Sequence, residues 1–278
     1  MSQNTTPVFI LGSGRCGTRA LFKLFSGIPE IEVHHEYCCT HIQPAAVEYF
    51  MGLMTRLEVR EKIRELHGAA IYYSPAKSWI DCSNKLSWII RPLYELFPDA
   101  KFVHLTRDGR KVVSSFYHKL SPEIYDDTSV QIMTEWLKNP SPPKPPPEKK
   151  YWWNIPQPGQ PFYEEFPSFD QFQRICYHWR EVTRIISESF SVLPPLKTMR
   201  VKLEDLTTSR AALKSLLDFL SIEYQEHFYE ALQRPEGVFF PMDFKLTSEQ
   251  LKQFKAITGD TMQRLGYDIN SELYEVKY

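Results

Sequence analysis

Short apolar runs followed by glycine or charged residues recur along the chain and predict alternating strands and helices. The run 7–11, PVFIL, is apolar and followed by a glycine, as is typical of a buried strand. Residues 18–28 then place leucine, phenylalanine and isoleucine at helical spacing, and Gly27 and Pro29 end that pattern. The first unit is therefore predicted to be a strand, a glycine-rich loop and a helix.

The same alternation returns later in the chain. Residues 87–97 and 110–120 have helical patterns, and the strand-like run 101–107 lies between them. Further strand and helix patterns follow at 197–203, 209–220 and 248–257. Strands that alternate with helices favour a three-layer α/β/α fold, in which helices cover both faces of a central parallel sheet.

One segment interrupts this alternation. Residues 139–168 are rich in proline, which is incompatible with helix interiors and central strands. The segment also carries tyrosine, tryptophan and phenylalanine, which a plain linker would not need. Two interpretations stay open, a lid over a substrate site and a packed structural loop. We expect residues 1–278 to form a single domain with an insertion at about 139–168.

Composition narrows the class of protein. The 278 residues are 42% hydrophobic and 14% aromatic, which is typical of a globular protein, and the net charge of −1 favours neither nucleic acid nor an anionic membrane as a partner. The sequence contains no apolar run of spanning length and no signal-like start. The five cysteines form no CxxC pair, which indicates reduced thiols. We therefore expect a cytoplasmic protein.

The stretch GSGRCGTR, residues 12–19, contains the candidate chemistry of the first unit. Gly12 and Gly17 have the separation of the phosphate-binding pattern GxxxxGK[ST], but Thr18 stands where that pattern has lysine. Arg15 brings a basic group into the loop instead. Backbone N–H groups at such a helix start bind phosphate, although ATP hydrolysis would lack its lysine and a clear acidic Mg²⁺ ligand. A tight turn without a ligand is the alternative interpretation.

This stretch resembles the 5′-phosphosulfate loop of the sulfotransferases that use 3′-phosphoadenosine 5′-phosphosulfate (PAPS). Arg15, Gly17 and Thr18 match the RSGTT form of that loop, whereas Cys16 and Arg19 depart from it. The resemblance implies a sulfotransferase fold similar to the P-loop NTPases, PAPS as sulfuryl donor, its product PAP, and no metal.

A second motif supports the resemblance. The stretch FPDAKFVHLTRDGRKVVSSF resembles the family's 3′-phosphate segment, in which Arg107 ends a strand and Ser115 follows on a helix. An arginine offers a two-pronged donor to a phosphate, and a serine hydroxyl adds a third donor. The alternative is that Arg107 pairs with Asp108. The stretches VKLEDL and RPEGVFFPMDFK resemble later family segments, with Leu203 in place of a tyrosine. The resemblance implies these cofactor-binding residues: Ser13, Gly14, Arg15, Cys16, Gly17, Thr18, Arg19, Arg107, Ser115, Arg234, Gly237 and Lys245.

The stretch EVHHEYCCTH offers candidates for the general base that an acceptor hydroxyl needs. Glu36 stands where related sulfotransferases have a glutamate base, and His35 and His34 are alternatives, with Arg15 as the catalytic cation. Strand alternation predicts Glu36 and His34 on one face and His35 on the other. The spacing of the histidines and cysteines does not favour a metal site.

A catalytic lysine is also implied before the FPDA turn. Counting back from that turn reaches Cys82, so Lys77 and Lys85 both stay open as its source. On the helical stretch RICYHWREV, Tyr177, Trp179 and Arg180 either contact an adenine or pack the helix.

The sequence thus predicts a PAPS-dependent sulfotransferase that acts on a hydroxyl of a small molecule, with secondary metabolites and amine acceptors left open. The alternatives are a P-loop nucleotide kinase or other phosphotransferase and a non-catalytic module that binds PAP or another nucleotide. We expect neither a nucleic-acid nor a membrane partner, and the oligomeric state stays open.

Overall fold

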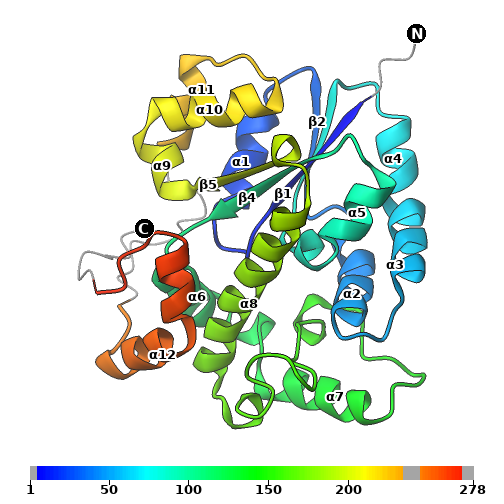
Figure 1. Ribbon diagram of the computed structural model, residues 1–278, viewed down its shortest axis with the longest axis vertical. Coiled ribbons are helices and arrows are strands. Elements are labelled where there is room, and N and C mark those ends of the chain that lie inside the picture. The colour runs from blue at the N-terminus through cyan, green and yellow to red at the C-terminus, as the bar shows by residue number, and fades with distance from the viewer. Residues whose placement is uncertain (1–4, 234–244, 271–278) are drawn as a thin grey trace.

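The computed structural model describes residues 5–233 and 245–270, which contain a five-stranded parallel sheet with helices on both faces (Figure 1). The strand order is β2-β3-β1-β4-β5. The strands are β1 (Thr6–Leu11), β2 (Ile31–His35), β3 (Ser78–Cys82), β4 (Lys101–Thr106) and β5 (Thr198–Lys202). The predicted three-layer α/β/α fold is confirmed.

Strand β1 lies at the centre of the sheet. Val8 of β1 pairs with Ile80 of β3 on one side and with Lys101 of β4 on the other. Because the strands are parallel, their carboxyl ends meet at one edge, where ligands bind in open α/β sheets. The segments after β3 and β4 therefore flank the loop after β1, and the segment after β2 lies beside that after β3.

Alternate residues of each strand enter two separate apolar cores. Val8 and Ile10 contribute to one core, and Phe9 and Leu11 contribute to the other. The first core is covered by α1 (Thr18–Phe25), α9 (Leu203–Thr208), α10 (Arg210–Leu220) and α11 (Glu226–Leu232). The second is covered by α2 (Cys39–Phe50), α3 (Arg56–Ile63), α4 (Ala69–Tyr72), α5 (Ile90–Leu96) and α8 (Gln171–Val192). Strands that are buried on both faces explain the apolar runs in the sequence.

A helical region lies beyond the carboxyl edge of the sheet, in the lower half of Figure 1. It contains α6 (Gly109–Lys119), α7 (Asp127–Lys138), α12 (Ser248–Arg264) and the first half of α8. Short helical turns complete the chain: η1 (Arg64–Gly68), η2 (Asn84–Trp88), η3 (Ser121–Glu123), η4 (Lys149–Tyr151), η5 (Phe166–Ser168) and η6 (Pro195–Lys197). The loops at the carboxyl ends of the strands thus lie between the sheet and this helical region.

The proline-rich segment 139–168 packs into this region. Trp152, Trp153 and Phe166 are buried in the second core. The amide of Asn154 donates to the Tyr177 hydroxyl of α8 at 3.2 Å. The aromatic part of the segment is therefore a packed structural loop, one of the two interpretations that the sequence left open.

Several elements were not predicted from the sequence pattern. Strand β3 contains Asp81, whose polar side chain interrupts the apolar run that marks the other central strands, although Asp81 is itself fully buried. Helices α2, α3 and α7 were also not predicted. Helix α12 extends to Arg264, past the predicted end at residue 257, because its buried positions continue through Thr261 and Met262.

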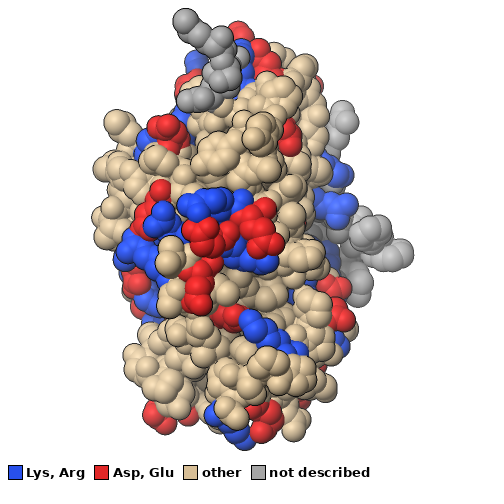
Figure 2. Space-filling model, turned by 90° about the vertical axis from the view of Figure 1, so that its right-hand side faces the viewer, with Lys and Arg blue, Asp and Glu red and all other residues tan. Residues whose placement is uncertain are grey.

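Charged side chains of both signs gather on the face shown in Figure 2. Arg56 and Arg60 of α3 pair with Glu95 of α5, and Arg64 of η1 pairs with Glu61 of α3. This pairing agrees with a net charge near zero, and exposed pairs of this kind contribute little to stability. Among the described residues, no helix is both long and apolar enough to cross a membrane.

Candidate functional site

The glycine-rich loop joins β1 to α1 through left-handed backbone. Gly14, Arg15 and Gly17 have φ values of 83°, 53° and 105°. A Cβ atom at Gly17 would lie 2.7 Å from Cδ1 of Leu203, so both backbone conformation and space require glycine there. Leu203, which replaces the family tyrosine, thus packs directly against the loop. Cys16, between Arg15 and Gly17, is not left-handed, and a loop that mixes the two hands in this way can turn backbone N–H groups inward, as anion-binding nests do.

Three side chains from other elements hold the carbonyl groups of this loop. Ser87 donates to the Gly12 carbonyl at 3.1 Å, and Arg107 donates to the Arg15 carbonyl at 3.0 Å. Nε2 of His178, on α8, lies 2.9 Å from the Ser13 carbonyl oxygen. Burial lowers the pKa of His178 to about 3, so the ring is neutral and carries its proton on Nε2 as the donor. The backbone of the loop is therefore fixed by buried groups.

Cys16, one of the two departures from the family loop, faces the protein interior. Its side chain is fully buried in the first core, and its Sγ atom would lie 2.5 Å from a Cβ placed on Gly12. Burial raises the pKa of the thiol to about 11, although the amides of Gly14 and Thr18 favour the thiolate. A protonated, enclosed thiol packs the loop from behind, so Cys16 offers only its backbone to a ligand.

The two candidate phosphate motifs meet at this loop. Nε of Arg15 donates to the hydroxyl of Ser115 on α6 at 3.0 Å. Arg107 reaches the same loop residue through its carbonyl. Lys119 follows Ser115 by one helical turn. Burial lowers the pKa of Lys119, and the nearby charges of Arg15 and Arg107 lower it further. Sequence reasoning missed Lys119, although its position four residues after Ser115 on a predicted helix was a usable signal.

The alternative role for Arg107 is not the observed one. The Arg110 guanidinium donates to Oδ2 of Asp108 at 2.7 Å. Oδ1 of Asp108 also accepts from the backbone N–H of Arg110, at the start of α6. The carboxylate of Glu204 accepts from the Asp108 backbone N–H at 2.9 Å and from the Tyr267 hydroxyl at 3.1 Å. Asp108 and Glu204 therefore build the turn that presents Arg107.

Glu36 lies just past the end of β2, between two lysines. Lys149 of the proline-rich segment donates to its Oε2 atom, and the ion pair leaves the Glu36 side chain 18% exposed. Burial opposes ionisation, but the charges of Lys85 and Lys149 and the hydrogen bond hold the pKa of the Glu36 carboxyl below its ordinary value. Glu36 is therefore a carboxylate at neutral pH.

The prediction that His34 shares a face with Glu36 is wrong. Glu36 has a φ of 56°, so the chain leaves the strand conformation and the alternation ends at His35. Nε2 of His34 lies 2.9 Å from Oε1 of Glu32, and the His34 ring packs against Trp79. His35 is the imidazole close enough to influence Glu36, and its Nε2 lies 3.4 Å from the Thr18 hydroxyl. Burial lowers the pKa of His35, and the Glu36 carboxylate only partly offsets this effect.

Asp81 supports the turn that carries Glu36. Its Oδ1 atom accepts from the Tyr37 backbone N–H at 3.2 Å, and the Cys82 carbonyl accepts from the Glu36 N–H at 3.3 Å. Burial, together with the charge of Glu36, raises the pKa of Asp81 well above its ordinary value. A neutral, enclosed carboxyl thus holds a left-handed turn that would otherwise be strained.

Of the two lysines left open, Lys85 lies at the site. It is 2% exposed on η2, and its Nζ lies 4.1 Å from the centroid of the Trp153 ring. Burial lowers the pKa of Lys85 to about 8, although the Glu36 carboxylate favours its charged form. Lys77 instead pairs with Glu30 at the opposite end of β3, at 2.5 Å.

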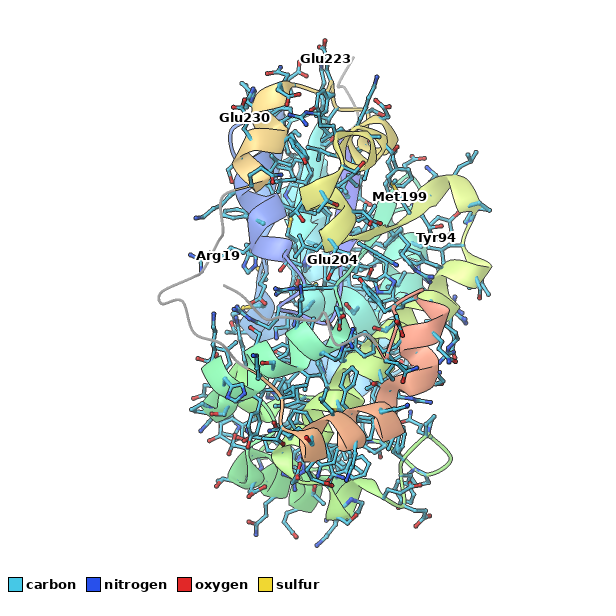
Figure 3. All side chains as sticks on the ribbon, turned by 90° about the vertical axis from the view of Figure 1, so that its left-hand side faces the viewer. Arg19, Tyr94, Met199, Glu204, Glu223 and Glu230 are labelled. Carbon is cyan, nitrogen blue, oxygen red and sulfur yellow. The ribbon has the colours of Figure 1, made fainter. Side chains whose placement is uncertain are left out.

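The other predicted contacts divide into three groups. Arg19 is exposed at the start of α1, at the outer edge of the molecule in Figure 3, at about the level of Glu204. Lys245 is exposed just before α12, whereas Arg234 and Gly237 lie outside the described residues. Tyr177 and Trp179 are buried, and Trp179 packs on Gly109, so both pack the helix.

No cluster of three or more histidine, cysteine or acidic side chains in the described parts of the chain is arranged to hold a metal ion. The five cysteines all lie within the described residues and are free thiols.

The chain is similar to known proteins in part of its sequence and in its fold. Residues 7–139 match the model of the sulfotransferase family. A sulfotransferase of Alicyclobacillus acidocaldarius aligns with 94% of this chain and 94% of its own, at a TM-score of 0.52 and 13% identity. A sulfotransferase of Mycobacterium avium aligns over 95% of this chain and 78% of its own, at a TM-score of 0.52 and 11% identity. At such identities the likeness concerns the fold.

No curated protein matches the chain in sequence. The matched family model covers both phosphate motifs, Glu36 and Lys85, and the aligned structures share the parallel sheet that brings them together. Residues 7–139 thus resemble the sulfotransferase family in sequence, and the chain shares the fold of known sulfotransferases.

Proposed function

We propose that the protein transfers the sulfuryl group of PAPS to a hydroxyl of a small-molecule acceptor. The observation that carries this proposal is the meeting of two phosphate motifs from distant parts of the chain. Arg15 of the first motif donates to Ser115 of the second, and Arg107 holds the Arg15 carbonyl. PAPS has a 5′-phosphosulfate and a 3′-phosphate, and this site offers adjoining donor sets for both.

The donor set suits these phosphates. The loop amides and Thr18 would bind the 5′-phosphate, while Arg107 and Ser115 would bind the 3′-phosphate, with Lys119 close by. Arg15 and Lys85 would hold the negative charge that develops as the bond between sulfur and the phosphate oxygen breaks. Fixed cations need no reorganisation at that moment, which is how such groups lower a barrier.

Glu36 is the proposed general base. It takes the proton of the acceptor hydroxyl while the acceptor oxygen forms its bond to sulfur and the 5′-phosphate of PAP leaves with its electron pair. A carboxylate that is ionised at neutral pH is ready for this step. His35 is the second candidate, because it contacts Thr18 and lies beside Glu36, and its lowered pKa favours the neutral ring that can accept a proton.

A binding comparison and a transfer assay test the proposal. PAP should raise the melting temperature of the protein more than AMP does, and more than ATP with Mg²⁺ does. Incubation with PAPS and a metabolite extract should yield a product heavier by one sulfuryl group. Stabilisation by ATP with Mg²⁺ but not by PAP would favour a nucleotide kinase, and binding of PAP without any transfer would favour a non-catalytic module.

A further inference from the structure

The ammonium group of Lys85 is buried without a conventional partner. Lys85 is 2% exposed on η2, and its Nζ atom forms no hydrogen bond or ion pair with any residue in 5–233 or 245–270, the parts of the chain that the structure describes. Removing an ammonium from water without such a partner is costly. The groups packed around Lys85 therefore decide where this charge lies and whether it is kept.

The indole ring of Trp153 contacts this ammonium directly. Nζ of Lys85 lies 4.1 Å from the centroid of the ring, within the range at which the face of an indole attracts a cation. Glu36 and Glu123 also favour the charged form of Lys85, but through charge alone and without a hydrogen bond. Trp153 thus provides a directional contact, which fixes where the ammonium lies.

The ring of Trp153 is held in turn by its neighbours. Its Nε1 atom donates to the Glu123 carbonyl at 2.9 Å, and the residue is buried. The ring of His178 meets it almost at a right angle, with 4.9 Å between the two centroids. His178 also contacts the Ser13 carbonyl of the glycine-rich loop. One histidine therefore supports both the loop and the ring that the Lys85 ammonium contacts.

The turn η2 places Lys85 next to the glycine-rich loop. A Cβ atom at Gly14 would lie 2.7 Å from Nδ2 of Asn84, the residue before Lys85. Ser87 of the same turn donates to the Gly12 carbonyl. Because no described residue takes the N–H donors of Lys85, these donors are available to an anion that the loop binds.

We propose that Trp153 is a positioning residue, which holds the Lys85 ammonium toward the 5′-phosphate that the glycine-rich loop binds. This inference rests on the proposed function, in which Lys85 stabilises the charge that develops on a phosphate oxygen as its bond to sulfur breaks. A contact through the ring face fixes the ammonium and leaves its N–H donors for that oxygen. Trp153 lies beyond residue 139, where the match to the family model ends, so the proline-rich segment contributes to the donor chemistry.

The test compares two probes that differ only in the 5′-phosphate, namely PAP and adenosine 3′-monophosphate. Affinities for both are measured calorimetrically on the full chain, and transfer rates are measured with PAPS. Trp153→Leu removes the ring face, and Trp153→Phe keeps a weaker one. The matched controls are Trp152→Leu and Trp152→Phe. Trp152 is also buried and donates to a backbone carbonyl, that of Pro146 at 2.7 Å.

We expect Trp153→Leu to lower the affinity for PAP relative to adenosine 3′-monophosphate by about 3- to 30-fold. Trp153→Phe should lower this ratio less, and both Trp152 variants should keep it within about twofold. In a Lys85→Met background, Trp153→Leu should have no further effect on the ratio, since the ring acts through the ammonium. Equal losses in the Trp153 and Trp152 variants, or a full loss without Lys85, would mean that Trp153 only packs the core. If Trp153→Leu does not fold, Trp153→Phe against Trp152→Phe decides.

The pH dependence of binding gives a second readout. Burial lowers the pKa of Lys85 to about 8, and the ring favours the ammonium, so its loss should lower the pKa further. The affinity ratio should therefore begin to fall at a pH about 0.5 to 1 unit lower in Trp153→Leu than in the wild type. A fall that begins at the same or a higher pH would overturn the inference. The other titratable groups around Lys85 are the same in both proteins: His35, Glu36, Cys39, Glu123, Lys149 and His178.

The binding measurements separate this inference from the proposed function. An affinity ratio that depends on Trp153 and Lys85, without any sulfated product, would support the placement of the ammonium by Trp153 and contradict sulfuryl transfer. Sulfation at equal rates by Trp153→Leu and Trp152→Leu would support sulfuryl transfer and contradict the role of Trp153. Equal affinity of the wild type for the two probes would contradict both.

Discussion

The two sides of the site are built differently. The first is the side of the glycine-rich loop, Arg107 and Ser115, here called the donor side, where Ser87, His178 and Arg107 donate hydrogen bonds to the loop carbonyls. The second is the side of Glu36, here called the acceptor side, where Lys149 reaches Glu36 from an irregular segment and stays partly exposed. One side is a loop whose carbonyls are held by side chains of other elements, and the other depends on the side chain of Lys149. If the proposed function holds, a protein built in this way would keep its donor constant and could change its acceptor through few residues.

Removal of the proposed base should have the largest effect. Glu36→Gln keeps the shape of the side chain but cannot take a proton, so kcat should fall by about 10²- to 10⁴-fold. Affinity for PAP, measured by calorimetry, should stay within a few-fold, since Glu36 lies outside the donor side. Full activity would move the role of the base to His35, which His35→Gln in the same assay would check.

Loss of Arg107 should weaken the donor side. Arg107→Ala removes the proposed 3′-phosphate donor and the hydrogen bond to the Arg15 carbonyl, so affinity for PAP should fall about 10- to 100-fold. AMP lacks the 3′-phosphate and is the matched probe, so its affinity should fall less. An equal loss for both ligands would mean that Arg107 only supports the loop.

The charge of Lys85 should set an upper pH limit to activity. Burial lowers the pKa of Lys85 to about 8, so its ammonium is present below that pH and is lost above it. Between pH 8 and 9 the charged fraction falls about fivefold, and kcat/KM should fall with it. Lys85→Arg keeps the charge at these pH values and should remove this decline. A decline that persists in the variant would belong to another group.

Removal of the histidine behind the loop should affect the site only indirectly, through the conformation of the loop. His178→Phe keeps a ring but leaves the Ser13 carbonyl without its donor, which should destabilise the fold by about 1–3 kcal/mol. The melting temperature should fall by a few degrees, and affinity for PAP by about threefold to tenfold. His178→Gln retains an N–H donor and should recover part of both losses. An unchanged affinity in His178→Phe would show that the loop holds its conformation alone.

The fold and the two candidate phosphate motifs were readable from the sequence because their signals are local, whereas their role in binding PAPS stays a prediction. An apolar strand, a glycine-rich loop and a helix are adjacent in the chain, and Arg107 and Ser115 repeat the arrangement one unit later. Strand β3 was missed because it contains the polar residue Asp81. The structure explains this aspartate, since its buried side chain accepts a hydrogen bond from the turn after β2.

The acceptor side was less readable because its contacts are distant in the chain. Glu36 was identified as a candidate base, but its left-handed backbone, which ends the strand alternation, is not encoded by a glycine. Lys149 lies 113 residues from Glu36 in the sequence, within a segment whose prolines give no regular pattern. Such contacts depend on tertiary packing, which propensity and periodicity do not describe.

Two consecutive residues of α8 join the two sides of the site. Tyr177 binds Asn154 of the proline-rich segment, and His178 binds the Ser13 carbonyl of the loop. A local opening that frees the segment from α8 would therefore disturb the helix turn on which the loop also depends. The two regions should lose amide-exchange protection together, as one cooperative unit, although they are far apart in the sequence.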